Sequence, residues 1–344
     1  MDLLRVICVF CVVSNHTIAL TWYVTDIDSL TWKINTVFKT MSYWCVPVFL
    51  MMSGSLFLNP DKDLDIQRLF KKNILKLLLS FLFWNLIYAF ILSRGNFSVT
   101  YLFNMVFTGD YHMWYIFMII AMYIITPILR PFVKDRKLEK YFLAIFFLTV
   151  FFIPEILNIL SLFDLWIFSD LVASLRLFID QVIHYLPNYC LMFFILGHYL
   201  VNTDLSPKQR KIIYALGVIS YILTVILTIV HSARINGPSG MFSDKNSMSP
   251  LMIGTAIFVT AQYGYDKIKF PPKVEALIST LSQCSFGIYL IHLVVIKSIY
   301  GIFDLALLPI PALVTSVVFP VIFFIFIAAI VWCLRKIPFL KYLL

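Results

Sequence analysis

The feature that most constrains the fold is a series of apolar segments, each about as long as a bilayer is thick. A hydrocarbon core of about 30 Å takes roughly 20 apolar residues of helix to cross, and in lipid the backbone must satisfy its own hydrogen bonds. The ten segments that meet this criterion are 3–23, 38–58, 74–93, 113–130, 141–160, 187–203, 212–231, 249–265, 285–302 and 311–334. The sequence therefore predicts an all-α, polytopic membrane bundle of about ten transmembrane helices.

The composition agrees with this fold class. Of the 344 residues, 61% are hydrophobic and 13% are charged, whereas soluble domains carry about 25% charged residues. No polar stretch is long enough for a soluble domain, so we expect residues 1–344 to form a single membrane domain. The net charge of +9 does not indicate a nucleic-acid partner, because the basic residues lie in short segments between apolar runs. We expect the lipid bilayer as a partner, and neither a metal site nor a bound cofactor.

The positions of the basic residues predict the orientation. If the N-terminus is cytoplasmic, the cytoplasmic segments are 59–76, 130–140, 203–211, 266–273 and 335–344. Together with Arg5 they hold 20 of the 27 Lys and Arg residues. That bias follows the positive-inside rule and predicts a multi-pass protein of the cell membrane with both termini in the cytoplasm. The first apolar run lacks a cleavage site of the signal-peptide type, so we interpret it as a spanning helix.

Two costly residues lie in that first helix. Arg5 and His16 are eleven residues apart, which is three helical turns plus about 20°, so both project from one face and lie roughly 16 Å apart along the axis. Titratable groups inside a membrane are expensive and usually functional. Arg5 could bind the phosphates of an anionic donor such as an acyl-CoA, and His16 could act as general base on an acceptor hydroxyl. A structural interpretation stays open, in which Arg5 snorkels and His16 bonds a neighbouring helix.

The other buried polar residues fall at two predicted depths. Those expected near the cytoplasmic face are Lys72, Lys76, His198 and His292, and those expected toward the outer half are His112, Trp114, Glu155 and Lys297.

Each of these residues has a functional and a structural interpretation. Lys72 and Lys76 are four residues apart on one helix face and could contact donor phosphates, or they are simply the charged end of a span. His292 is a further candidate for donor binding. His198 is expected to be a histidine of a helix interface.

On the outer side, Glu155 could pair with Lys297 as a structural ion pair or serve as a second acid or base. Trp114 or Lys297 could stabilise an oxyanion, and His112 is a further candidate on the acceptor side.

Six segments resemble, in order, those of the bacterial membrane enzymes called acyltransferase family 3. The opening LLRVICVFCVVSNH is similar to the first helix of that family, in which Arg or Lys is followed after ten residues by His. The other five segments are VPVFLMMSGSLFL at 46–58, FKKNILKLLL at 70–79, HMWYIFMIIAMYIITPILRP at 112–131, FFILGHYL at 193–200 and CSFGIYLIHL at 284–293. One departure is that Asn73 and Lys76 stand where relatives often carry an Arg-x-x-Arg pair.

The resemblance implies a ten-helix fold in the bacterial plasma membrane. It further implies cytoplasmic acyl-CoA, such as acetyl-CoA, as co-substrate, a glycan or glycolipid hydroxyl as acceptor, His16 as catalytic base and Arg5 in donor binding. An alternative is a transporter or membrane partner domain for small amino acids or lipid-linked sugars, which would use the same cavity without acyl transfer.

Overall fold

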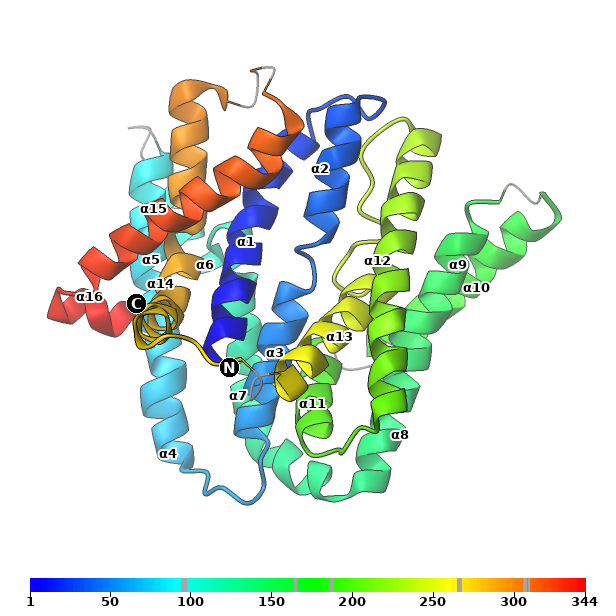
Figure 1. The fold of residues 1–344 in the computed structure, drawn as a ribbon, viewed down its shortest axis with the longest axis horizontal. Coiled ribbons are helices and arrows are strands. Elements are labelled where there is room, and N and C mark those ends of the chain that lie inside the picture. Colours follow the sequence, from blue (N-terminus) through cyan, green and yellow to red (C-terminus); the bar gives the residue numbers. More distant parts are fainter. Residues whose placement is uncertain (94–97, 164–165, 186–188, 265–267, 306–307, 309) are drawn as a thin grey trace. The chain divides into compact units, whose positions relative to one another are not determined.

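The computed structural model describes residues 1–93, 98–163, 166–185, 189–264, 268–305, 308 and 310–344, and its regular secondary structure within these ranges is helical (Figure 1). Contacts divide the chain into two compact units, each made of stretches that are separate in sequence. Unit 1 consists of Met1–Val24, Lys62–Pro127 and Lys269–Leu344. Unit 2 consists of Thr25–Asp61 and Ile128–Ile268.

Unit 1 contains the helix that holds Arg5 and His16, together with the helices that pack against it. Its elements are α1 (Asp2–Trp22), α4 (Ile66–Arg68), the π-helical η1 (Leu69–Ile74), α5 (Leu75–Leu92), α6 (Val99–Thr108), the 3₁₀ turn η2 (Tyr111–Met113), the first part of α7 (Trp114–Lys134), α14 (Pro272–Phe303), the π-helical η6 (Val314–Val318), α15 (Phe319–Leu334) and α16 (Pro338–Leu343).

Unit 2 contains the remaining helices. Its elements are α2 (Leu30–Thr40), α3 (Cys45–Phe57), the end of α7, α8 (Arg136–Phe146), the π-helical η3 (Phe147–Phe152), α9 (Ile153–Leu160), α10 (Trp166–Tyr185), α11 (Tyr189–Val201), α12 (Pro207–Ile235) and α13 (Met248–Gly264). Ser29 begins α2 by accepting a hydrogen bond from the backbone N–H of Trp32. This cap places a helix where the sequence predicted only a connection.

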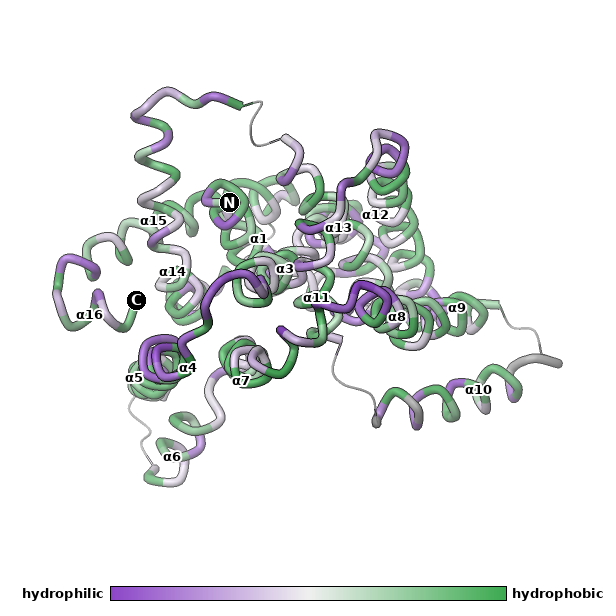
Figure 2. Tube along the Cα trace, turned by 90° about the horizontal axis from the view of Figure 1, so that it is seen from below, coloured by the Kyte–Doolittle hydropathy of each residue, from purple (hydrophilic) through white to green (hydrophobic). Residues whose placement is uncertain are grey.

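The helices confirm the membrane fold class. Among the described residues, eight helical stretches are long and apolar enough to cross a bilayer. The other two predicted segments, 187–203 and 249–265, overlap α11 and α13, which have 13 and 17 residues. A count of ten spans therefore stays a prediction. Figure 2 shows apolar residues along most helices, whereas the segment leading into α4 and α4 itself are hydrophilic.

Within unit 1, α1 packs against both α14 and α15 (Figure 1). Arg5 bonds Ser282 on α14, and eleven residues further along α1 His16 contacts His292, which is ten residues further along α14. The two helices therefore run in the same direction, as expected for the first and ninth predicted spans.

Within unit 2, α3 and α11 approach each other through two glycines. A Cβ at Gly54 would lie 1.7 Å from the carbonyl oxygen of Phe194, and a Cβ at Gly197 would lie 2.0 Å from that of Met51. Small residues allow helix backbones to meet this closely in membranes. Gly54 of the segment VPVFLMMSGSLFL and Gly197 of the segment FFILGHYL thus share one packing role.

Candidate active site

The helix α1 holds Arg5 and His16 on one continuous stretch of α-helix from Asp2 to Trp22. The spacing that the sequence predicted, roughly 16 Å along the axis and one shared face, therefore holds. The two side chains contact different parts of α14, because Arg5 bonds Ser282 and His16 contacts His292. One face of α1 thus presents two separate polar sites within unit 1.

Three histidine rings gather at the polar site around His16. The centroid of the His16 ring lies 5.0 Å from that of His292 and 6.4 Å from that of His112, and the latter two are 5.0 Å apart. His16 is half-buried, whereas His112 and His292 are 3% and 0% exposed. The three rings come from α1, from η2 and from α14, which are far apart in sequence.

This cluster corrects the depth predicted for His292. The sequence placed it near the cytoplasmic face with Lys72 and Lys76, but its ring lies beside His16 and His112. The predicted depth was wrong because the start of the helix was misplaced. The helix α14 begins at Pro272, whereas the predicted span began at residue 285. His292 is therefore in the middle of a long helix, away from its first turns.

Tyrosines from α5 and α14 hold the two buried histidines. Tyr88 donates from its hydroxyl to the carbonyl oxygen of Leu290 at 3.0 Å and accepts from the backbone N–H of Val294 at 3.0 Å. The same oxygen lies 3.4 Å from His112 Nε2. Tyr289 donates to the carbonyl oxygen of His112 at 2.9 Å. These bonds fix η2 and its histidine against α14.

The hydrogen bonds also assign the ring nitrogens. His292 Nδ1 lies 2.7 Å from the carbonyl oxygen of Tyr289 and must donate to it, so in the neutral ring Nε2 carries a lone pair. The hydrogen of the Tyr88 hydroxyl is committed to Leu290, so His112 Nε2 donates to Tyr88 and His112 Nδ1 carries the lone pair. Both of these buried nitrogens lack a hydrogen-bond partner within the described part of the chain.

A short segment before α7 completes the site around His16. The hydroxyl of Tyr111 lies 3.0 Å from His16 Nδ1. Asp110 accepts the backbone N–H of Tyr111 through Oδ1 at 2.7 Å and the ammonium of Lys297 through Oδ2 at 2.7 Å. Lys297 Nζ also lies 4.9 Å from the centroid of the Tyr111 ring.

This arrangement gives Lys297 a partner that the sequence did not indicate. Within unit 1, its ammonium pairs with Asp110. Glu155 belongs to unit 2, where its carboxylate accepts the backbone N–H of Met248 at 3.4 Å. The sequence did not indicate Asp110 as the partner of Lys297, because Asp110 lay in a predicted outer connection.

At the other polar site, Arg5 joins a small closed network. Its guanidinium donates to Asp2 at 3.2 Å and to the Ser282 hydroxyl at 3.0 Å, and that hydroxyl donates to Asp2 at 2.8 Å. The guanidinium is about one-third exposed.

The two candidate lysines differ in their surroundings. Lys76, on α5, lies with Nζ 5.5 Å from the Phe286 ring of α14. Lys72 is exposed and lies in the π-helical η1, where the α-helical spacing that placed both lysines on one face does not apply. Trp114 begins α7, with its ring 6.3 Å from that of Tyr115.

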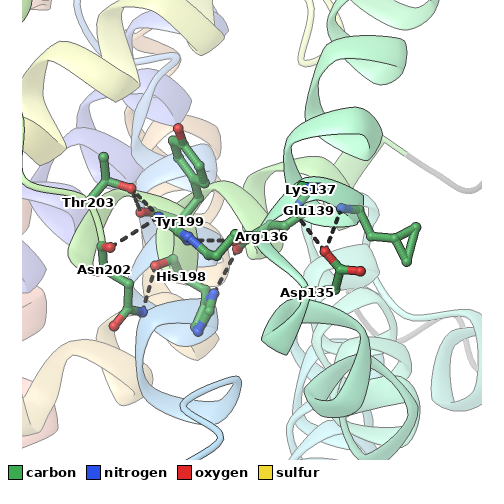
Figure 3. Close-up of polar contacts among 9 residues, drawn as sticks. Asp135, Arg136, Lys137, Glu139, His198, Tyr199, Asn202 and Thr203 are labelled. Carbon is green, nitrogen blue, oxygen red and sulfur yellow. Dashed lines mark hydrogen bonds and ion pairs between the residues drawn. The ribbon is translucent and has the colours of Figure 1, made fainter.

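Unit 2 has its own buried polar network (Figure 3). Glu139 is 0% exposed and bonds Arg136 at 2.5 Å and His198 Nδ1 at 2.7 Å. Arg136 also donates to the carbonyl oxygen of Asn202 at 3.0 Å. The network joins α8 to α11, so His198 is the interface histidine that the sequence predicted.

Sequence reasoning missed Asp110, Tyr111 and Tyr88. Asp110 and Tyr111 were in a predicted connection, and Tyr88 was one aromatic residue among many in a predicted span. The run Gly109-Asp110-Tyr111-His112 was the available signal, since a glycine and an acid directly before a buried histidine suggest a shaped turn. In the described ranges no group of three His, Cys, Asp or Glu side chains is arranged to hold a metal ion.

The fold and the site define a multi-pass helical membrane protein whose apolar interior holds a histidine site. The sequence matches the family model of an acyltransferase domain over residues 1–335 of 344. The chain belongs to this family, acyltransferase family 3, and is a membrane acyltransferase. Comparison with curated proteins and with solved structures gives no significant match.

Proposed function

We propose that the protein transfers an acetyl group from cytoplasmic acetyl-CoA to a hydroxyl of a cell-surface polysaccharide or glycolipid. The observation that carries this proposal is the group of three imidazoles at His16, which lies on the same face of α1 as Arg5 and roughly 16 Å from it along the helix axis. An acyltransferase needs a base for the acceptor and a separate binding region for the donor.

The ring nitrogens of the cluster favour a hydroxyl acceptor. His112 Nδ1 and His292 Nε2 carry lone pairs in their neutral rings and are buried without a donor among the described residues. Leaving a buried acceptor atom unpaired costs about 1–3 kcal/mol. The hydroxyl groups of a sugar supply the donors that these two nitrogens need, whereas an anionic phosphate does not. His292 is therefore better assigned to the acceptor than to the donor.

The reaction needs one proton transfer in each direction. His16 takes the proton of the acceptor hydroxyl through Nε2, and the hydroxyl oxygen attacks the thioester carbonyl carbon. The tetrahedral intermediate collapses with cleavage of the carbon–sulfur bond, and the imidazolium returns the proton to the leaving CoA sulfur. The products are an O-acetyl ester and free CoA, so atoms and charges balance.

The donor is assigned to the Arg5 end of α1. Arg5 is one-third exposed and near Ser282, and Lys76 lies over Phe286 four residues further along α14. A guanidinium and an ammonium suit the phosphates of CoA. The roughly 16 Å between Arg5 and His16 leaves room for an extended arm that ends in the thioester.

The test uses inside-out vesicles from a bacterial host that expresses the protein, supplied with [¹⁴C]acetyl-CoA. We expect release of free CoA and alkali-labile label on the envelope polysaccharide, both lost in His16→Ala. Thr17→Ser, on the next position of α1, is the matched control and keeps activity. Full activity in His16→Ala would refute the mechanism. Label movement without release of CoA would favour transport.

A further inference from the structure

The segment before α7 is shaped so that Tyr111 points its hydroxyl at His16. The helix α6 ends at Thr108, and the C-cap that follows is Gly109, whose φ of +72° is a conformation that side chains rarely allow. A Cβ there would lie 2.9 Å from the Phe81 ring and 3.0 Å from the amide nitrogen of Asn85. The glycine therefore lets the chain turn tightly against α5 and begin η2 at Tyr111.

An ion pair then holds this turn to α14. The Asp110 carboxylate bridges the backbone N–H of Tyr111 and the Lys297 ammonium, each at 2.7 Å. The carboxylate is 7% exposed and the ammonium side chain 30%. The same Lys297 Nζ lies 4.9 Å from the Tyr111 ring centroid, where a cation attracts the face of an aromatic ring. Backbone and ring of Tyr111 are thus both fixed.

The hydroxyl of Tyr111 lies 3.0 Å from His16 Nδ1, and the chemistry of the ring restricts the direction of this bond. A neutral imidazole has one donor and one acceptor nitrogen. If Tyr111 donated to Nδ1, Nε2 would carry the proton and neither nitrogen would have a lone pair available to a substrate. His16 can act as a base only when Nδ1–H donates to the Tyr111 oxygen.

We propose that Tyr111 is a positioning residue for His16, which fixes the ring and its tautomer, and that the Asp110–Lys297 ion pair holds Tyr111 in place. This inference rests on the proposed function of His16. The partner of a catalytic histidine commonly sets which nitrogen is protonated. Here the phenol of Tyr111 sets which nitrogen of His16 is protonated.

The exposure of Tyr111 separates this role from a packing role. Tyr111 as a whole residue is 56% exposed, so replacement by Phe removes the hydroxyl and leaves the ring contacts and the core intact. Tyr300, on α14, provides a matched control. Its hydroxyl donates to the carbonyl oxygen of Thr17, the residue after His16, at 3.5 Å. This bond is made to the backbone of α1 and not to the imidazole of His16.

The experiment measures kcat and KM for acetyl-CoA in the vesicle assay for wild type, Tyr111→Phe, Tyr300→Phe, Lys297→Met and His16→Ala. A hydrogen bond to a charged group contributes about 1.5–3 kcal/mol, so we expect Tyr111→Phe to lower kcat about tenfold or more with an unchanged KM. Lys297→Met should lower kcat in the same way but less, and Tyr300→Phe should change neither constant.

The outcomes separate the two proposals. If His16→Ala is inactive while Tyr111→Phe keeps the wild-type kcat, the positioning role is wrong and the base assignment stands. If Tyr111→Phe raises KM as much as it lowers kcat, or if Tyr300→Phe loses as much activity, the effect is structural and the inference fails. If His16→Ala is fully active, the proposed mechanism itself fails.

Discussion

Replacing Gly197 by alanine tests the packing on which unit 2 depends. Gly197 lies on α11 against α3, and a Cβ there would be 2.0 Å from the Met51 carbonyl oxygen and 2.4 Å from its Cα. Ordinary van der Waals contact begins at 3.4 Å, so the two helices must separate by about 1.4 Å at this point. The obstructing atoms are backbone atoms, which cannot rotate away.

The expected cost follows from overpacking. Inserting one methyl group into a well-packed interior typically costs about 1–3 kcal/mol, and a clash with backbone puts Gly197→Ala near the upper end. The gain in helix propensity from Gly to Ala, about 1 kcal/mol, offsets only part of this. We therefore expect a net loss of about 2 kcal/mol in the free energy of unfolding.

The assay is unfolding of the purified protein in mixed micelles, followed by circular dichroism as the denaturing detergent increases. Gly237→Ala is the control, because an added Cβ at Gly237 meets no described heavy atom within 4 Å. It should leave the midpoint unchanged, whereas Gly197→Ala should unfold at a lower detergent fraction. A Gly197→Ala protein as stable as wild type would show that α3 and α11 do not meet as described.

Three further predictions concern charged side chains. Arg5→Gln should raise KM for acetyl-CoA about tenfold or more with a smaller change in kcat, as loss of a charge-assisted bond to phosphate implies; steady-state kinetics would show it, and an unchanged KM would contradict it. Lys297→Met should destabilise more than the double variant with Asp110→Asn, because only the single change leaves a buried charge unpaired; micelle unfolding of both variants decides. Glu139→Gln should cost roughly 3 kcal/mol of stability, since Glu139 is 0% exposed between two basic partners, and equal stability to wild type would refute this.

The fold class could be predicted because its cause is local. Every predicted span overlaps a helix, since a lipid environment demands about 20 apolar residues with satisfied backbone bonds. The count was harder, because α11 and α13 are shorter than a full span and α2 began at a serine cap inside a predicted connection. The length of an apolar segment in the sequence does not indicate where a helix within it is interrupted.

The site could be predicted only where one helix determined it. Arg5 and His16 share α1, so helical geometry alone gave their spacing. The partner of Lys297 depended on how a turn at Gly109 packs against α14, and the depth of His292 depended on where α14 begins. Both require tertiary structure, which is why the sequence did not indicate Asp110 as the partner of Lys297 and grouped His292 with Lys72 and Lys76 rather than with His16.

The distance between Arg5 and His16 along α1 also restricts which acyl donors can react, and this allows one more test. A donor that bonds Arg5 through phosphate and presents its acyl carbon to His16 must span roughly 16 Å. Acetyl-CoA has a long arm between its phosphates and its thioester, whereas acetyl phosphate carries the acetyl group directly on phosphorus. Acetyl phosphate can therefore occupy one end or the other but not both, and binding at one end alone positions no reacting carbon. We expect acetyl phosphate to give no transfer in vesicles that are active with acetyl-CoA, and to inhibit only weakly. Efficient transfer from acetyl phosphate would show that Arg5 and His16 do not act on two ends of one donor.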